Sequence, residues 1–204
     1  MAKSRESGST KFAVTIEGIG IGLLLHAWTD EATQSVTSGS RQASRPGGAT
    51  NGQEPRDIAA QFLYLGMEDK KTLVIPQDNL FACMIGGGRF HKIGRSQCTT
   101  RDSSLVPAGL AIMEAEMPIK PQKWEVDIRR VINQNTKQSI VSFRPWFPKW
   151  SVSFTLLVDH DMFSSEDARI IVDYAGKRIG VGTRRPERKG PYGRFVVTEW
   201  KKLS

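Results

Sequence analysis

The chain has 204 residues, of which 39% are hydrophobic, and a formal net charge of +8, so it can fold as a single domain with a core. No apolar run approaches the roughly 20 residues that span a bilayer, and the polar residues after Met1 do not form a secretory signal. The two cysteines, Cys83 and Cys98, form neither a metal-ligand pattern nor a disulfide framework. We therefore expect a cytoplasmic protein with no membrane partner, no metal and no cofactor.

The positive charge is concentrated near the C-terminus. Between Lys177 and Ser204 there are nine Lys and Arg residues and two acidic ones, which gives +7 of the total of +8. A local positive field of this kind attracts polyanions and accelerates their association. The alternative is a solvated basic tail that has no specific ligand.

The N-terminal part of the chain predicts a strand followed by an insertion. Residues 1–11 are polar, and we expect them to be disordered. At 12–17 apolar residues alternate with small or polar ones, which predicts a first strand. From 29 to 57 the chain has almost no large apolar residue, so it cannot bury a core face. We expect this segment to protrude from the domain, either flexible or ordered only by a neighbouring subunit.

The first predicted helix lies near 78–86. Asp78 is placed to cap it, because its carboxylate can accept a bond from an orphan backbone amide. Cys83 falls in its apolar part, and we expect it in the core. The helix should fray at the triple glycine 86–88, since each internal glycine costs about 1 kcal/mol relative to alanine.

The second predicted helix lies near 165–175. Ser164 or Ser165 caps it, and its apolar residues recur with the i, i+3, i+4, i+7 spacing of one buried face. We expect Gly176 to end this helix.

The remaining alternating segments predict strands at 110–117, 124–132, 139–143, 150–158 and 194–200. The turn residues 133–136 should join two of them into a hairpin. The segment 144–148 contains two prolines, which should interrupt the sheet.

The order of these elements predicts one α+β domain over residues 12–204. With the hairpin counted as an addition, it is the β-α-β-β-α-β order of a ferredoxin-like (RRM-like) fold. We expect an antiparallel sheet that contains 12–17, 150–158 and 194–200, backed by two helices. An extra β-hairpin and the long polar insertion complete the prediction.

The most prominent functional candidate is a basic, glycine-rich loop at 176–195. Five glycines let its backbone approach a ligand closely, and the interleaved cations suit phosphate. It lacks the Gly-Lys-Ser/Thr of a Walker A loop, and it follows a helix where a dinucleotide fingerprint follows a strand. The alternative is a loop that is merely basic. The candidate contacts are Lys177, Arg178, Arg184, Arg185, Arg188, Lys189 and Arg194.

Two further segments could contact nucleic acid. Arg144 and Trp146 combine a cation with an aromatic ring suited to base stacking, although neighbouring aromatics of this segment could equally anchor a strand in the core. Arg89 and Lys92 belong to a second, smaller basic cluster.

Catalytic chemistry finds little support in the sequence. His26, His91 and His160 are scattered and lack metal-ligand spacing, and no serine lies in a nucleophile elbow. We expect the protein not to be an enzyme. The alternative is a metal-independent ribonuclease in which His91 acts as a general acid or base.

Several motifs resemble an uncharacterised family of proteins from tailed phages and prophages. They are Arg144-Pro145-Trp146 with Trp150, Ala175-Gly176 with Arg178, Gly180 and Gly182, Arg185-Pro186 and Gly193-Arg194-Phe195. They cover about half of the chain. Where that family often has Asp-Trp before Arg-Pro, this chain has Thr183-Arg184, which makes the loop more basic. The resemblance implies a phage protein in a bacterial host cell.

More distantly, the element order and the glycine-rich loop after the last helix resemble the RAMP superfamily. These ferredoxin-like proteins form the guide-RNA-coating backbone of CRISPR effector complexes. The resemblance implies binding of RNA or single-stranded DNA by subunits stacked side by side.

We therefore expect a protein that binds single-stranded nucleic acid, RNA or DNA, through the basic loop and without base specificity, as a homo-oligomer. The alternative is a phage structural or inhibitory protein that binds an acidic protein partner, with the insertion as its contact arm.

Overall fold

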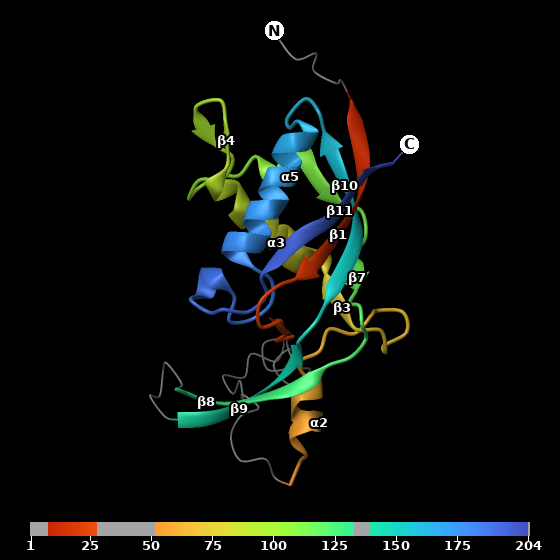
Figure 1. The fold of residues 1–204 in the computed structure, drawn as a ribbon, viewed down its shortest axis with the longest axis vertical. Coiled ribbons are helices and arrows are strands. Elements are labelled where there is room, and N and C mark those ends of the chain that lie inside the picture. The colour runs from red at the N-terminus through yellow and green to blue at the C-terminus, as the bar shows by residue number, and fades with distance from the viewer. Residues whose placement is uncertain (1–7, 28–51, 133–138, 204) are drawn as a thin grey trace, which may run out of the picture.

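The computed structural model describes residues 8–27, 52–132 and 139–203 (Figure 1). Its central element is a four-stranded antiparallel sheet with the strand order β11-β1-β10-β6. These strands are β1 (Ser9–Gly18), β6 (Leu110–Ile112), β10 (Ser151–Asp159) and β11 (Phe195–Lys202).

Two helices pack together on one side of this sheet (Figure 1). They are α3 (Gln77–Gly87) and α5 (Ser165–Tyr174). Along the chain the elements follow the order β1-α3-β6-β10-α5-β11, which is the β-α-β-β-α-β order of the ferredoxin-like fold. The predicted α+β, ferredoxin-like fold class is confirmed.

The core forms where the alternating strands meet the apolar helix faces. Strand β1 buries Phe12, Val14 and Ile16, and β10 buries every second residue from Val152 to Val158. Ser164 caps α5 in a reciprocal capping box with Asp167, as the sequence predicts for one of its two candidates.

The triple glycine does not fray α3, and this prediction was wrong. Gly86 and Gly87 are buried inside the helix. A Cβ atom on Gly87 would lie 2.5 Å from the carbonyl oxygen of Ile171 in α5, so glycine allows the two helices to approach closely. Asp78 is not the cap either; Pro76 occupies the N-cap position, and Asp78 lies in the first turn.

Two further helix and strand boundaries differ from expectation. Gly176 does not end the last helix, because a wide helical turn, η2 (Ala175–Ile179), continues it. The predicted strand 110–117 is two strands, since β6 pairs with β10 whereas β7 (Glu116–Pro118) pairs with β3 (Val74–Pro76).

A second sheet of three strands lies at one end of the central sheet (Figure 1). Its order is β2-β9-β8, where β2 spans Leu23–Leu24, β9 Ser139–Phe147 and β8 Glu125–Ile132, and α2 (Pro55–Ala60) packs against β8 and β9. Strands β8 and β9 form the predicted hairpin.

Strand β9 continues through Pro145, so the expected interruption at 144–148 was wrong for most of that segment. The Pro145 carbonyl accepts a hydrogen bond from the Leu25 amide. The amide and the carbonyl of one strand residue point to the same side, so the amide hydrogen that Pro145 lacks would have pointed towards the β2 segment. The hydrogen bonds between β9 and β8 are therefore unaffected.

The smaller elements lie in the connections between α3 and β6 and between α5 and β11. They are β4 (Lys92–Ile93), β5 (Ser96–Gln97), α4 (Val106–Gly109), η1 (Gly88–Phe90) and η3 (Pro186–Arg188). In the described part of the chain, no helix is both long and apolar enough to cross a bilayer.

Some predictions fall on residues that the structure does not describe. Residues 1–7, most of the insertion and the turn 133–136 lie outside the described residues. Strand β1 already begins at Ser9, before its expected start. At the other end of the insertion, 55–57 form the first turn of α2.

Candidate nucleic-acid interface

The glycine-rich loop folds back onto the segment around β2. The amide of Thr183 donates to the Leu24 carbonyl at 2.9 Å, and the amide of Gly193 donates to the Gly22 carbonyl at 2.8 Å. Gly182 has φ +78°, and a Cβ atom there would lie 2.3 Å from the Leu24 oxygen. At this position glycine therefore serves the packing of the loop on its own chain.

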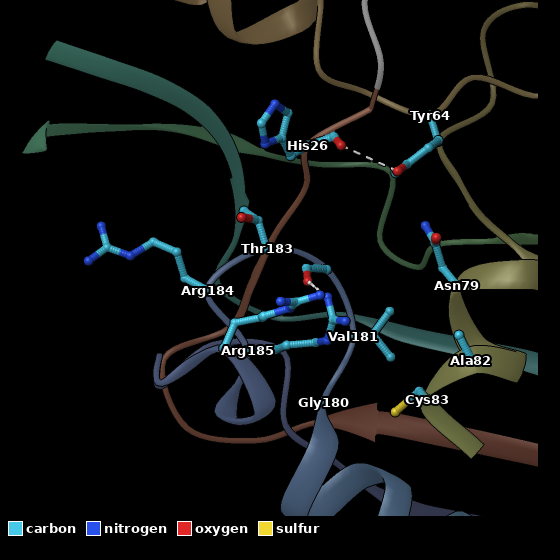
Figure 2. A pocket seen from close by; sticks show the side chains of 12 residues that line it. His26, Tyr64, Asn79, Ala82, Cys83, Gly180, Val181, Thr183, Arg184 and Arg185 are labelled. Carbon is cyan, nitrogen blue, oxygen red and sulfur yellow. Dashed lines mark hydrogen bonds between the residues drawn. The ribbon is translucent and has the colours of Figure 1, made fainter. Parts of the chain in front are cut away.

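This packing leaves a cavity of about 500 Å³ between the loop and α3 (Figure 2). Its walls come from four separate parts of the chain: the residue His26, the residue Tyr64, helix α3 and the loop. The lining residues are His26, Tyr64, Asn79, Ala82, Cys83, Gly180, Val181, Gly182, Thr183, Arg184, Arg185 and Arg188.

A second cavity of about 240 Å³ adjoins the first and shares His26, Thr183 and Arg184 with it. One face of the β8–β9 hairpin forms its other side. The remaining lining residues are Leu24, Asp127, Arg129, Val131, Ser142 and Arg144. We call the two cavities together the basic groove.

The loop arginines differ in how far their charge is already compensated. Arg185 donates to Glu187 through Nε at 3.2 Å and Nη2 at 2.8 Å, and to the Gly182 carbonyl at 3.0 Å. Arg184 and Arg188 are exposed, and the guanidinium group of neither has a hydrogen-bond or ion-pair partner among the described residues. The side chain of Arg184 extends away from Asn79 and towards the second cavity (Figure 2).

Arg144 lies in the second cavity and is half-buried. Its guanidinium stacks 3.9 Å from the ring centroid of Phe62, and it donates to the Phe143 carbonyl at 2.9 Å. Burial lowers the pKa of Arg144 to about 10, so the group is still protonated at neutral pH. Asp127 lies opposite in the ladder, but its carboxylate binds Arg129 Nε at 2.7 and 2.8 Å. Arg144 is thus a partly desolvated cation without an acidic partner in the described part of the chain.

The structure brings together four of the predicted contacts, namely Arg144, Arg184, Arg185 and Arg188. The others line neither cavity. Arg89 binds Glu187 at 3.2 Å, and Arg178 stacks 4.6 Å from the ring centroid of Phe90. Trp146 donates from Nε1 to the Ile21 carbonyl at 2.7 Å, which fixes its ring. Lys92, Lys177, Lys189 and Arg194 are exposed.

The aromatic neighbours of Trp146 anchor the strand in the core, which is the alternative that the sequence left open. Phe147 and Trp150 are fully buried and belong to the core. The segment 144–150 therefore supplies one groove residue, Arg144, and two core anchors.

The sequence did not indicate several groove residues, among them His26, Tyr64, Asn79 and Arg129. The sequence could have indicated Arg129, because Asp127 and Arg129 are two residues apart in a predicted strand and therefore lie on one face of the hairpin. In the structure Arg129 stacks on Tyr192 and donates to its hydroxyl. His26, Tyr64 and Asn79 sit in unremarkable local sequence, and only the fold brings them together.

His91 lies outside the groove, at the cap of α5. Its Nε2 is 2.7 Å from Asp167 Oδ1. Burial raises the pKa of Asp167, but hydrogen bonds from Ser164 and His91 outweigh this and lower it below its ordinary value. Among the described residues, no group of three or more His, Cys, Asp or Glu side chains could hold a metal ion.

No family model matches the chain, and no curated protein matches it. Among solved structures, it is similar to a chain in the cryo-EM structure of Type III-B Cmr-beta bound to cognate target RNA, with a TM-score of 0.50 and 10% sequence identity. The match covers 97% of this chain but only 61% of the other. At this identity the likeness shows the fold alone: the chain is an α+β protein with a ferredoxin-like fold.

Proposed function

We propose that this protein binds single-stranded nucleic acid, RNA or DNA, by holding its phosphates in the basic groove. The observation that carries the proposal is that the positive charge of three arginines is not compensated by a carboxylate in the described chain. Arg184 and Arg188 are unpaired within the described chain, and Arg144 is partly desolvated with no carboxylate partner. A cation withdrawn from water is stabilised by an anionic ligand, and guanidinium groups match phosphate geometry.

The size of the groove favours one strand over a duplex. Cavities of about 500 and 240 Å³ are of the scale that takes small-molecule groups, such as a phosphate, a sugar or a base. Phosphate contacts carry no sequence information, so the arginines should bind all sequences about equally. The RNA bound to the structurally similar protein supports a nucleic-acid ligand in general.

Fluorescence anisotropy with labelled strands tests this proposal. We expect the nuclease-treated protein to bind single-stranded RNA or DNA more tightly than a duplex of the same length, at low salt. Equal or tighter binding of the duplex, or no binding to any of the three, would refute it.

A second candidate, binding of a protein partner, is favoured by one observation on the hairpin. Ile128, Ile132 and Val141 are 56%, 65% and 44% exposed, and the strand register puts all three on the face opposite the groove. Exposed apolar clusters are typical of protein–protein contacts. Arg130 between them favours an acidic partner.

A second copy of this chain is the partner that fits the expected homo-oligomer. The chain itself displays an acidic hollow lined by Glu68, Asp69 and Glu116 beside the exposed Met67. The ultraviolet absorbance ratio of the purified protein separates the candidates at little cost, since a nucleic-acid binder should retain nucleic acid and a purely protein-binding one should not.

A further inference from the structure

The larger cavity of the basic groove is not built only for phosphate. Its floor is uncharged: the Val181 side chain is buried there, and the buried Cys83 thiol donates to the Ala175 carbonyl at 3.3 Å. Burial raises the pKa of Cys83, so the thiol stays neutral. A phosphate would gain nothing from this floor, whereas the flat apolar face of a base would.

Two aromatic residues form one wall of this cavity and are held in place. The Tyr64 hydroxyl donates to the His26 carbonyl at 3.3 Å (Figure 2). The His26 ring packs edge-on against Phe62, with 5.1 Å between the ring centroids. Stacking on such rings is a general way to hold a nucleobase of an unpaired strand.

Asn79 supplies a polar group that has no other evident use. It lies in the first turn of α3, half-buried, and its carboxamide has no hydrogen-bond partner among the described residues. A carboxamide presents a donor and an acceptor side by side, which matches the edge of a base in a bidentate pair. Figure 2 shows Asn79 and Tyr64 on the side of the cavity opposite the loop arginines.

We infer that this cavity receives one unstacked base of the bound strand, with Asn79 pairing to its edge and the loop arginines holding the adjacent phosphates. The inference rests on the proposed function and deepens it. Contacts to phosphate do not discriminate between bases, so the cavity would add a preference for one base at a single position of each bound segment.

The test compares variants on RNA 12-mers of A, of U and of C, and on a 12-mer with abasic sites. Asn79→Ala removes the amide, and Ala82→Phe fills the cavity from its exposed rim without touching the core. We expect wild-type protein to prefer one homopolymer and to bind the abasic strand at least fivefold more weakly. Both variants should lose this preference, with a roughly tenfold drop in affinity for the favoured strand.

The control is Asp78→Ala, an exposed neighbour in the same helical turn that does not line the cavity. It should keep the wild-type preference. The salt slope of binding should be the same in all these proteins, because no phosphate contact changes.

The outcomes separate this inference from the proposed function. If the wild-type protein binds the abasic strand as tightly as the others, or if Asn79→Ala and Ala82→Phe keep the wild-type preference, the base cavity is refuted while strand binding stands. If the wild-type protein binds none of these strands and no single-stranded DNA 12-mer either, the proposed function fails and the inference fails with it.

Discussion

Arg144 and Arg185 are chemically identical side chains that the fold places in opposite situations. Arg185 shares its charge with Glu187, so a ligand must compete with an existing ion pair. Arg144 is stacked on Phe62 and partly removed from water, and the carboxylate opposite it in the ladder, Asp127, is occupied by Arg129. A half-buried, uncompensated charge is costly for folding and is typical of a binding site.

The lowered pKa of Arg144 fixes the sign of its effect on stability. At pH values between about 10 and the ordinary pKa of arginine, the unfolded chain binds more protons than the folded chain, so the free energy of unfolding rises with pH there. At neutral pH the charged Arg144 therefore destabilises the fold. We predict that Arg144→Met, which keeps the packing on Phe62, leaves the melting temperature of the ligand-free protein unchanged or raised. The same variant should bind single strands several-fold more weakly.

The two readouts for Arg144→Met are a thermal melt and an anisotropy titration. Arg169→Met, at an exposed site on α5, is the matched control and should change neither. A lower melting temperature with unchanged affinity would mean that Arg144 serves the fold and not the ligand.

At the scale of elements, the contact between α3 and α5 depends on glycine. Helix propensity alone favours alanine at Gly87 by about 1 kcal/mol. The structure opposes this, because a Cβ atom there would lie 2.5 Å from the Ile171 oxygen and 2.8 Å from the Ala175 amide nitrogen. Both are backbone atoms of a packed helix, so relief would require the two helices to separate.

We predict that Gly87→Ala lowers the free energy of unfolding by about 1–3 kcal/mol despite the gain in propensity. Urea denaturation measures this. Ala82→Gly, on the exposed side of the same helix, should lose about 1 kcal/mol from propensity alone. A Gly87→Ala protein more stable than wild type would contradict the close packing of α3 on α5.

At the scale of the whole molecule, local sequence signals predicted the elements better than the site. Alternation identified β1 and β10, and the capping residues with an apolar face identified α5. These signals work because each is contained within about ten neighbouring residues. They failed at 86–88, where contacts with α5 outweigh the low helix propensity of glycine.

The groove depends on contacts between residues far apart in sequence, which no local pattern reports. Thr183 bonds to Leu24, and Arg144 stacks on Phe62. The charge excess near the C-terminus pointed to the loop that lines the groove. It could not tell that Arg178 would lie over Phe90, away from the groove.

The salt dependence of binding tests the central claim most directly. Arg184→Ala/Arg188→Ala removes two unpaired groove cations, and Arg101→Ala/Arg169→Ala removes two exposed arginines that line neither cavity. If each groove arginine contacts one phosphate, the slope of log K against log salt for a single strand should flatten by about 1.4 in the groove variant. It should stay at the wild-type value in the control. Equal slopes and affinities in the two variants would contradict the groove as the nucleic-acid site.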